Sequence, residues 1–285
     1  MTIAKLTTTN HSRDIVGLTY VYPVLSRRSG GLSIGINLNP NNACNWRCIY
    51  CQVPNLQRGS APKIDLDQLE SELREFLQDV LEGNFFDRFE VKPECRQICD
   101  IALSGNGEPT TAREFEGVIE RLTKTIRDYR LDGTINVVLI TNGSMIHKMH
   151  IQRALEQIST LGGEIWFKLD SATDKGLKQI NNAGYTIANA ARNLEIASRL
   201  CPTWLQTVAF ALDGSPMSKI DQIEYIEFLK NLVMNQVPLK GVLLYGLARP
   251  SLQPEASRLS ELPCESLEAL ASKIQDCGIS VKVSC

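Results

Sequence analysis

Three cysteines lie close together in the stretch Ala43-Cys44-Asn45-Trp46-Arg47-Cys48-Ile49-Tyr50-Cys51. Their spacing is C-x3-C-x2-C, and an aromatic residue directly precedes the last cysteine. Soft thiolate ligands select iron–sulfur clusters or zinc. A closed structural zinc site or a closed electron-transfer cluster uses four protein ligands. Three thiolates on one loop therefore suit three irons of a [4Fe-4S] cube and leave the fourth iron open. A three-cysteine zinc site with a distant fourth ligand is the rival interpretation.

The composition is ordinary for a globular protein. Of the 285 residues, 43% are hydrophobic and 22% are charged, and the net charge is −2. Proteins that bind nucleic acid usually carry a basic footprint, which this balance does not show. Residues 1–10 lack the charged-then-apolar order of a signal peptide, and the apolar runs are too short to cross a bilayer. We therefore expect a cytoplasmic protein with no membrane partner.

The six remaining cysteines are scattered: Cys95, Cys99, Cys201, Cys264, Cys277 and Cys285. The total of nine is odd, and cytoplasmic enzymes keep their thiols reduced, so we expect no disulfide framework. Cys95 and Cys99 could contribute to a second cluster. No second tight triplet exists, however, and this favours free thiols at all six positions.

Apolar, β-branched runs alternate with amphipathic helical patterns along the chain. The patterns predict strands at residues 32–38, 98–103, 135–140, 164–169, 203–209 and 239–244, with a short terminal strand at 279–283. They predict helices at residues 66–80 (after Asp65, a good N-cap), 115–126, 147–158, 187–200, 220–232 and 267–274. Residues 250–263 contain three prolines and are predicted to form a loop.

This alternation is typical of parallel βα units. It predicts an α/β fold with six such units in a single domain over residues 1–285. The domain comprises an N-terminal extension (1–31), a core (32–249) and a C-terminal segment (250–285) with a short helix and strand. In a barrel of parallel strands, chemistry takes place at the C-terminal ends of the strands.

Polar runs follow three of the predicted strands: Ser104-Gly105-Asn106-Gly107-Glu108-Pro109-Thr110, Thr141-Asn142-Gly143 and Lys168-Leu169-Asp170-Ser171. Glycines let a backbone approach a ligand closely, although such runs are usually turns. The last run could also be a helix cap, with Ser171 or Thr173 accepting backbone N–H groups. The positions of the runs therefore indicate ligand contacts, with a turn and a cap as the alternatives.

Three arginines lie beside the predicted core. Arg249 follows the sixth strand, and Arg27 and Arg28 precede the first. Guanidinium groups bind phosphate or carboxylate through paired hydrogen bonds. We interpret all three as ligands of an anionic substrate, with solvated surface arginines as the alternative.

The cysteine motif resembles the signature of the radical S-adenosylmethionine (radical SAM) superfamily. In that family three cysteines hold a [4Fe-4S] cluster, and its open iron chelates the amino and carboxylate groups of S-adenosylmethionine. Reductive cleavage then gives a 5′-deoxyadenosyl radical, which abstracts hydrogen from a substrate. The resemblance implies Cys44, Cys48 and Cys51 as ligands and a partial (β/α)6 TIM-like barrel. It also implies an external one-electron donor of the flavodoxin or ferredoxin type.

The resemblance further implies residues that bind S-adenosylmethionine. The first polar run is similar to the family's Gly-Gly-Glu-Pro motif, which binds the amino group, with Asn106 in place of the first of the paired glycines. Lys168 or Ser171 would meet the carboxylate, Asp170 a ribose hydroxyl, and the Tyr50 backbone the adenine. The complete expected set is Tyr50, Gly105, Asn106, Gly107, Glu108, Asn142, Lys168, Asp170 and Ser171.

Further segments between Val21 and Pro250 resemble a narrower group. These are Pro-Val-x-Ser-Arg-Arg, Gly-Ile-Asn-Leu at the first strand, and Ala-Arg-Pro after the last strand. The group contains uncharacterised Fe–S oxidoreductases related to the wyosine-synthesising tRNA enzymes. Those enzymes add a second cluster and, in eukaryotes, a flavin domain, neither of which is evident in this sequence. We expect a radical SAM enzyme with a small-molecule or RNA substrate. The alternatives are a wyosine-like tRNA-modifying enzyme and a non-catalytic metal-binding or electron-transfer protein.

Overall fold

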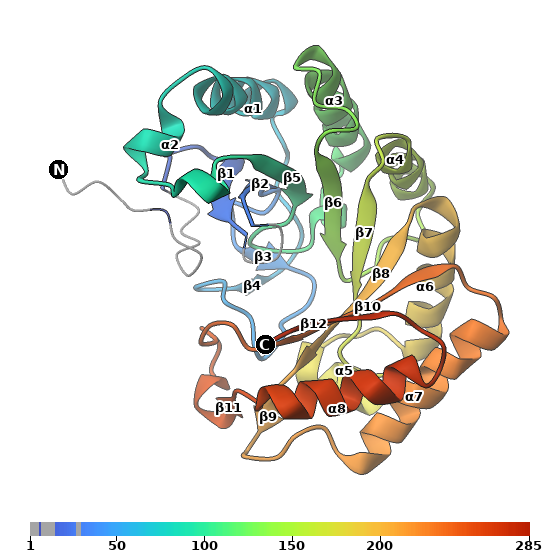
Figure 1. The fold of residues 1–285 in the computed structure, drawn as a ribbon. Helices are drawn as coiled ribbons and strands as arrows, with labels where there is room; N and C mark the ends of the chain where they lie inside the picture. The colour runs from blue at the N-terminus through green and yellow to red at the C-terminus, as the bar shows by residue number, and fades with distance from the viewer. Residues whose placement is uncertain (1–5, 7–14, 27–29) are drawn as a thin grey trace.

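A curved sheet with helices on its outer side forms the framework of the protein (Figure 1). The computed structural model describes residue 6 and residues 15–26 and 30–285. These residues form an eight-stranded sheet in the order β1-β2-β5-β6-β7-β8-β10-β12. β1 pairs with β2 antiparallel, and every other neighbouring pair is parallel. The predicted α/β fold with a partial barrel is confirmed.

The six predicted core strands are all present. The main sheet contains β1 (Val21–Leu25), β2 (Leu32–Ile36), β5 (Ile98–Leu103), β6 (Asn136–Thr141), β7 (Glu164–Lys168), β8 (Thr203–Ala209), β10 (Leu239–Gly246) and β12 (Val281–Ser284). Two small sheets pair β3 (Ala43–Cys44) with β4 (Gln57–Arg58) and β9 (Ala211–Leu212) with β11 (Leu259–Ser260).

The predicted helices are also present, and a short α2 and α5 are additional. The α-helices are α1 (Leu66–Leu81), α2 (Phe85–Arg88), α3 (Phe115–Asp128), α4 (Met149–Thr160), α5 (Asp174–Asn181), α6 (Ile187–Leu200), α7 (Lys219–Met234) and α8 (Cys264–Gln275). Single 3-10 turns are η1 (Pro93–Cys95), η2 (Pro109–Thr111) and η3 (Ala256–Arg258). Asp65 caps α1 as predicted, because its side chain accepts from the N–H groups of Asp67 and Gln68.

The N-terminal extension supplies β1, an edge strand that the sequence patterns did not predict. The Tyr22 ring lies over Gly35 on β2, where a Cβ atom would be only 2.2 Å from the ring. Because the neighbour is a glycine, the Tyr22 hydroxyl can reach Ser104 Oγ at 2.9 Å. The buried Glu72 carboxylate of α1 accepts the N–H of Tyr20 at 2.7 Å. These contacts fix β1 against both the sheet and α1.

The hydrophobic core lies between the sheet and its outer helices. All seven residues of β8 are buried, as expected for a parallel strand in the interior of a sheet. The fold buries only part of the apolar surface of α7. Tyr225 and Leu229 are buried, whereas Ile220 is 72% exposed.

The C-terminal segment contains a disulfide, which corrects the expectation that all six remaining cysteines are free thiols. Cys264, the first residue of α8, is bonded to Cys285, with their Cα atoms 5.5 Å apart. The two meet because β12 returns alongside β10 after α8. None of the helices in the described part of the chain combines the length and apolar character that a bilayer crossing requires. The cytoplasmic location stays a prediction.

Candidate functional site

The three motif cysteines lie on one loop that begins at β3 and leads away from the end of β2. Asn39 supports the loop from below, because its Nδ2 donates to the carbonyl of Ala43 at 2.9 Å. The N–H of Trp46 lies 3.5 Å from Cys44 Sγ, and Cys51 N–H donates to the carbonyl of Cys48 at 3.0 Å. A backbone N–H therefore faces the Cys44 thiol, and a backbone hydrogen bond joins Cys48 to Cys51.

Two distant segments hold this loop in place. At the C-terminal end of α5, the carbonyl oxygen of Ile180 accepts the N–H of Ile49 at 2.8 Å. On the other side runs the strap, which we define as residues 249–255 after β10. Ser251 Oγ lies 2.7 Å from the carbonyl oxygen of Ile49, and Glu255 forms two hydrogen bonds of 2.8 Å with Arg47. The cysteine loop is thus tied to parts of the chain more than 100 residues away.

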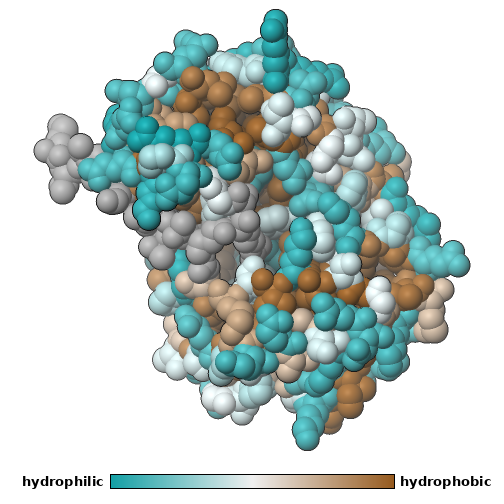
Figure 2. Space-filling view, viewed as in Figure 1, coloured by the Kyte–Doolittle hydropathy of each residue, from teal (hydrophilic) through white to brown (hydrophobic). Residues whose placement is uncertain are grey.

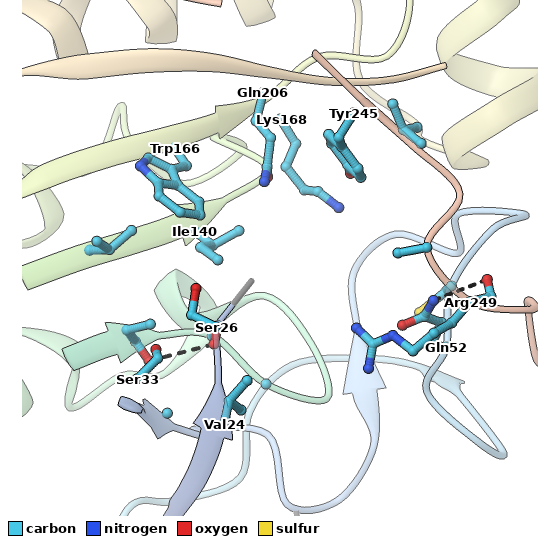
Figure 3. A pocket seen from close by; sticks show the side chains of 18 of the residues that line it. Val24, Ser26, Ser33, Gln52, Ile140, Trp166, Lys168, Gln206, Tyr245 and Arg249 are labelled. Atoms are coloured by element: carbon cyan, nitrogen blue, oxygen red, sulfur yellow. Dashed lines mark hydrogen bonds between the residues drawn. The ribbon is translucent and has the colours of Figure 1, made fainter. Parts of the chain in front are cut away.

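A cavity of about 390 Å³ lies between this loop and the inner face of the sheet. Among the expected site residues, it is lined by Cys48, Tyr50, Cys51, Gly105, Lys168 and Arg249. Figure 3 shows Lys168, Gln206 and Tyr245 pointing into it from the strands, opposite Ser26 and Ser33. The surface in the orientation of Figure 1 is also hollowed near the middle of the molecule (Figure 2). The structure therefore brings six of the expected residues around one space, whereas Cys44, Asn106, Gly107, Glu108, Asn142, Asp170 and Ser171 do not line it.

Of the three arginines expected to bind a substrate, only Arg249 lies among the described residues. Arg249 lines the cavity, and its backbone carbonyl accepts a hydrogen bond from Gln52 Nε2 at 3.1 Å (Figure 3). Arg27 and Arg28 lie outside the described residues. The role of all three in binding a substrate stays a prediction.

The glycine run after β5 passes directly beneath the cysteine loop. A Cβ atom on Gly107 would lie 2.1 Å from the carbonyl oxygen of Ala43, and one on Gly105 would lie 2.2 Å from Asn37 Oδ1. Only glycine fits this close approach. Asn37 Oδ1 also accepts the N–H of Asn106 at 3.0 Å. The run therefore packs against Asn37 and the start of the loop, and its role in binding a ligand stays a prediction.

Glu108 is a buried carboxylate whose hydrogen bonds go to the protein. It accepts from Thr110 and Thr141 hydroxyls at 2.5 Å and 2.6 Å, and from the N–H of Asn142 at 2.7 Å. Burial raises the pKa of Glu108, while these donors oppose the rise. The Asn142 side chain in turn donates to Asn45 on the cysteine loop at 2.8 Å. The two residues thus link the ends of β5 and β6 to the loop.

Asp170 joins the end of β7 to the cysteine loop. Its carboxylate accepts from the Tyr50 hydroxyl, from Asn181 Nδ2 at 2.7 Å and from the N–H of Val208 at 3.1 Å. The helix cap of α5 is Thr173, whose side chain accepts the N–H of Gly176 at 3.0 Å. Asp170 is therefore not a cap residue.

Ser171 lies beside that cap and lines a neighbouring cavity together with Asp170. Its hydroxyl accepts the N–H of Thr173 at 3.2 Å. The neighbouring cavity, of about 590 Å³, lies between α5, α8 and the segment after β8. Val208 lines both cavities, so only a thin wall separates them.

Lys168 brings a buried positive charge to the cavity wall. Its Nζ lies 3.3 Å from the Tyr50 hydroxyl and 5.0 Å from the centre of the Tyr50 ring. Burial acts to lower the pKa of Lys168, but the nearby Tyr245 and Asp170 outweigh it and raise that pKa, so the side chain stays an ammonium. It forms no ion pair with any described residue. Among the described residues its Nζ hydrogen-bonds to Tyr50, which leaves further N–H donors for an anionic group in the cavity.

The assignment of the three motif cysteines to one cluster stays a prediction. In residues 15–26 and 30–285, no group of three His, Cys, Asp or Glu side chains is arranged to hold one metal ion. A cube binds each cysteine through a different iron, so its ligands stand further apart than those of one zinc ion. Burial raises the pKa of Cys44 to about 12 and that of Cys48 to about 11. Metal binding would replace the thiol protons.

Several supporting residues were not predicted from the sequence. They are Asn45, Asn181, Ser251, Gln253 and Glu255, all of which contact the cysteine loop or hydrogen-bond with residues next to it. Asn45 lies between Cys44 and Cys48, so its position in the sequence could have indicated a supporting role. The other four are polar residues in a helix end and a proline-rich loop, where such residues are common.

Comparison with known proteins gives a consistent result. The family model "Radical SAM superfamily" matches residues 38–229, more than half of the chain. A UPF0026 protein of Synechocystis sp. is 24% identical over 280 residues, covering 93% of this chain and 95% of the relative. The GTPase Obg of Brachyspira hyodysenteriae is 31% identical over 136 residues, but this chain covers only 17% of its length.

Solved structures agree on the fold. A structure of TYW1 with a lysine–pyruvate adduct bound has a TM-score of 0.56 and 14% identity, covering 86% of this chain and 73% of that one. A mutant of spore photoproduct lyase has a TM-score of 0.53 and 10% identity, covering 85% and 73%. At these identities the likeness shows the fold alone. Together with the family match, it shows that the chain belongs to the radical SAM superfamily.

Proposed function

We propose that this chain binds one [4Fe-4S] cluster through Cys44, Cys48 and Cys51 and uses it to cleave S-adenosylmethionine reductively. The observation that carries the proposal is the position of these cysteines on one loop, with Cys48 and Cys51 lining a cavity inside a radical SAM fold. When bound, the cluster supplies one electron that splits S-adenosylmethionine into methionine and a 5′-deoxyadenosyl radical, which takes a hydrogen atom from the substrate. The electron comes from an external donor of the flavodoxin or ferredoxin type.

The other residues around the loop bind and orient. Gly107 brings the backbone close to the loop at Ala43, and Gly105 packs against Asn37 before it, so that S-adenosylmethionine can be held against this backbone. Lys168 is suited to the carboxylate of the methionine moiety, because its ammonium faces the cavity without an ion-pair partner among the described residues. Glu108, Asn142 and Asp170 hold the loop and the strand ends in register through their hydrogen bonds.

The cavity favours a substrate that carries negative charge. Besides Lys168, which is assigned to S-adenosylmethionine, Arg249 lines it, and a guanidinium binds phosphate or carboxylate with paired hydrogen bonds. Arg249→Ala should leave uncoupled cleavage of S-adenosylmethionine to 5′-deoxyadenosine largely intact while weakening binding of an anionic substrate. If the substitution abolishes cleavage with the cluster still full, Arg249 belongs to the cofactor site instead.

The proposal is tested with the full chain after anaerobic reconstitution with iron and sulfide. With dithionite and S-adenosylmethionine, the wild-type protein should form 5′-deoxyadenosine and methionine in equal amounts. Cys48→Ala should lose both the iron and the cleavage, whereas Cys95→Ala, a cysteine outside the loop, should retain both. A colourless wild-type protein that binds zinc would support the metal-binding alternative and contradict the proposal.

A further inference from the structure

Asn181 places a buried carboxamide against the cysteine loop from the end of α5. The side chain is fully buried, and its Nδ2 donates to Cys48 Sγ at 3.3 Å and to Asp170 Oδ2 at 2.7 Å. Both amide N–H groups are thus used, whereas Oδ1 has no hydrogen-bond partner among the described residues. The reverse orientation would turn Oδ1 toward a thiolate and a carboxylate, which are both acceptors. The N–H groups therefore face the sulfur even though this leaves the oxygen without a partner.

The backbone fixes the distance between this amide and Cys48. The carbonyl groups in the last turn of a helix lack partners within the helix. On α5, the carbonyl of Asn181 accepts the N–H of Arg47 at 3.1 Å, and that of Ile180 accepts the N–H of Ile49 at 2.8 Å. These two bonds lie on either side of Cys48 in the sequence. The Nδ2–Sγ contact is therefore built into the packing of α5 on the loop.

A hydrogen bond to a ligand sulfur changes the energy of the cluster. The reduced cluster carries one more negative charge than the oxidised one, so an N–H donor stabilises the reduced form more strongly and raises the reduction potential. We propose that Asn181 is a positioning residue that sets the reduction potential of the cluster through its Nδ2–H to Cys48 Sγ. This inference rests on the proposed function, because it requires Cys48 to be a cluster ligand.

The test is a redox titration of the reconstituted full chain followed by electron paramagnetic resonance. Asn181→Leu removes the donor and keeps much of the side-chain volume. We expect about a tenfold shift of the reduction equilibrium toward the oxidised cluster, which equals a fall of about 59 mV for one electron. Asn193→Leu is the matched control, because Asn193 is also buried with an unpartnered Oδ1, but its Nδ2 donates to the carbonyl of Gly143 at 2.8 Å.

The control should keep the wild-type potential. If Asn181→Leu does not unfold cooperatively, Asn181→Ala replaces it, since alanine also lacks the donor and introduces no extra volume. Wild-type potential in an Asn181 variant with full iron content would overturn the inference. Loss of the cluster in both Asn181→Leu and Asn181→Ala would also overturn it, because a hydrogen bond that only tunes the potential is not needed for cluster assembly. Failure of the wild-type protein to assemble a cluster would instead contradict the proposed function.

Discussion

The strap at residues 249–255 should control how fast the cysteine loop opens, and Ser251→Ala tests this directly. The Ser251 hydroxyl lies 2.7 Å from the carbonyl oxygen of Ile49 and accepts the N–H of Gln253 at 3.0 Å. Without it, both buried backbone groups lose these partners. The carbonyl of Cys51 is less affected, because the N–H of Leu252 still donates to it at 2.9 Å.

The expected magnitude follows from these two groups. An unsatisfied buried polar group costs about 1–3 kcal/mol, and partial relaxation brings the sum for the pair to roughly 2 kcal/mol. Since each 1.4 kcal/mol is about tenfold in an equilibrium, the open loop should become about 30 times more populated. Amide hydrogen exchange in the cysteine loop should accelerate by that factor. Iron loss from the reconstituted protein to an excess of chelator should accelerate by a similar factor.

Ser198→Ala provides the matched control. Ser198 and Ser251 are each 7% exposed, but the Ser198 hydroxyl donates at 3.0 Å to the carbonyl of Glu195 within the same helix. Its loss should change neither rate noticeably. If Ser251→Ala exchanges and loses iron no faster than Ser198→Ala, the strap does not hold the loop and the reasoning is wrong.

Two further substitutions test the packing and the charges of the scaffold. Gly143→Ala should lower the free energy of unfolding by about 2–4 kcal/mol, because φ is +73° and the new Cβ would lie 2.1 Å from the Phe167 ring. Gly162→Ala, with φ +70° and open space, should cost only about 1 kcal/mol in the same urea titration, and equal losses would exclude the ring contact as the cause. The Arg121 guanidinium holds the pKa of Glu70 at about 2, against an ordinary value of 4.5. Burial opposes this shift, and Arg74 and Lys124 add to it. A carboxylate with a lowered pKa stabilises the folded state at pH values above its ordinary pKa. At pH 7 the free energy of unfolding of the wild type should therefore exceed that of Glu70→Gln by about 1–2 kcal/mol after solvent screening. This difference should shrink as the pH falls from about 5 toward 2, and a constant difference would contradict the assignment.

The sequence was most informative where local pattern and local structure coincide. The strands β5 and β8 and the helix α6 begin and end at the predicted residues. A buried strand rich in apolar and β-branched residues and a helix with one apolar face both leave a signal in the local sequence pattern. The cysteine spacing is equally local, because all three residues of the motif lie between positions 44 and 51. These features were sufficient for the fold class and the superfamily.

Features that depend on distant pairing were not predictable from local pattern. β1 is a strand because Tyr22 covers Gly35 and Glu72 binds the backbone at Tyr20. Cys264 and Cys285 meet only because β12 returns beside β10.

The candidate site divides in the same way. The sequence alone indicated which residues follow the strands and that Cys44, Cys48 and Cys51 form one set. It could not tell which of these side chains face the cavity. Lys168 does so, whereas the hydrogen bonds of Glu108 go to other parts of the protein. Nor could it place Asn181 and the strap against the loop, because a hydrogen bond between residues more than 100 positions apart leaves no periodic trace. Only the packing of α5 and of the segment after β10 brings those donors to the cysteines.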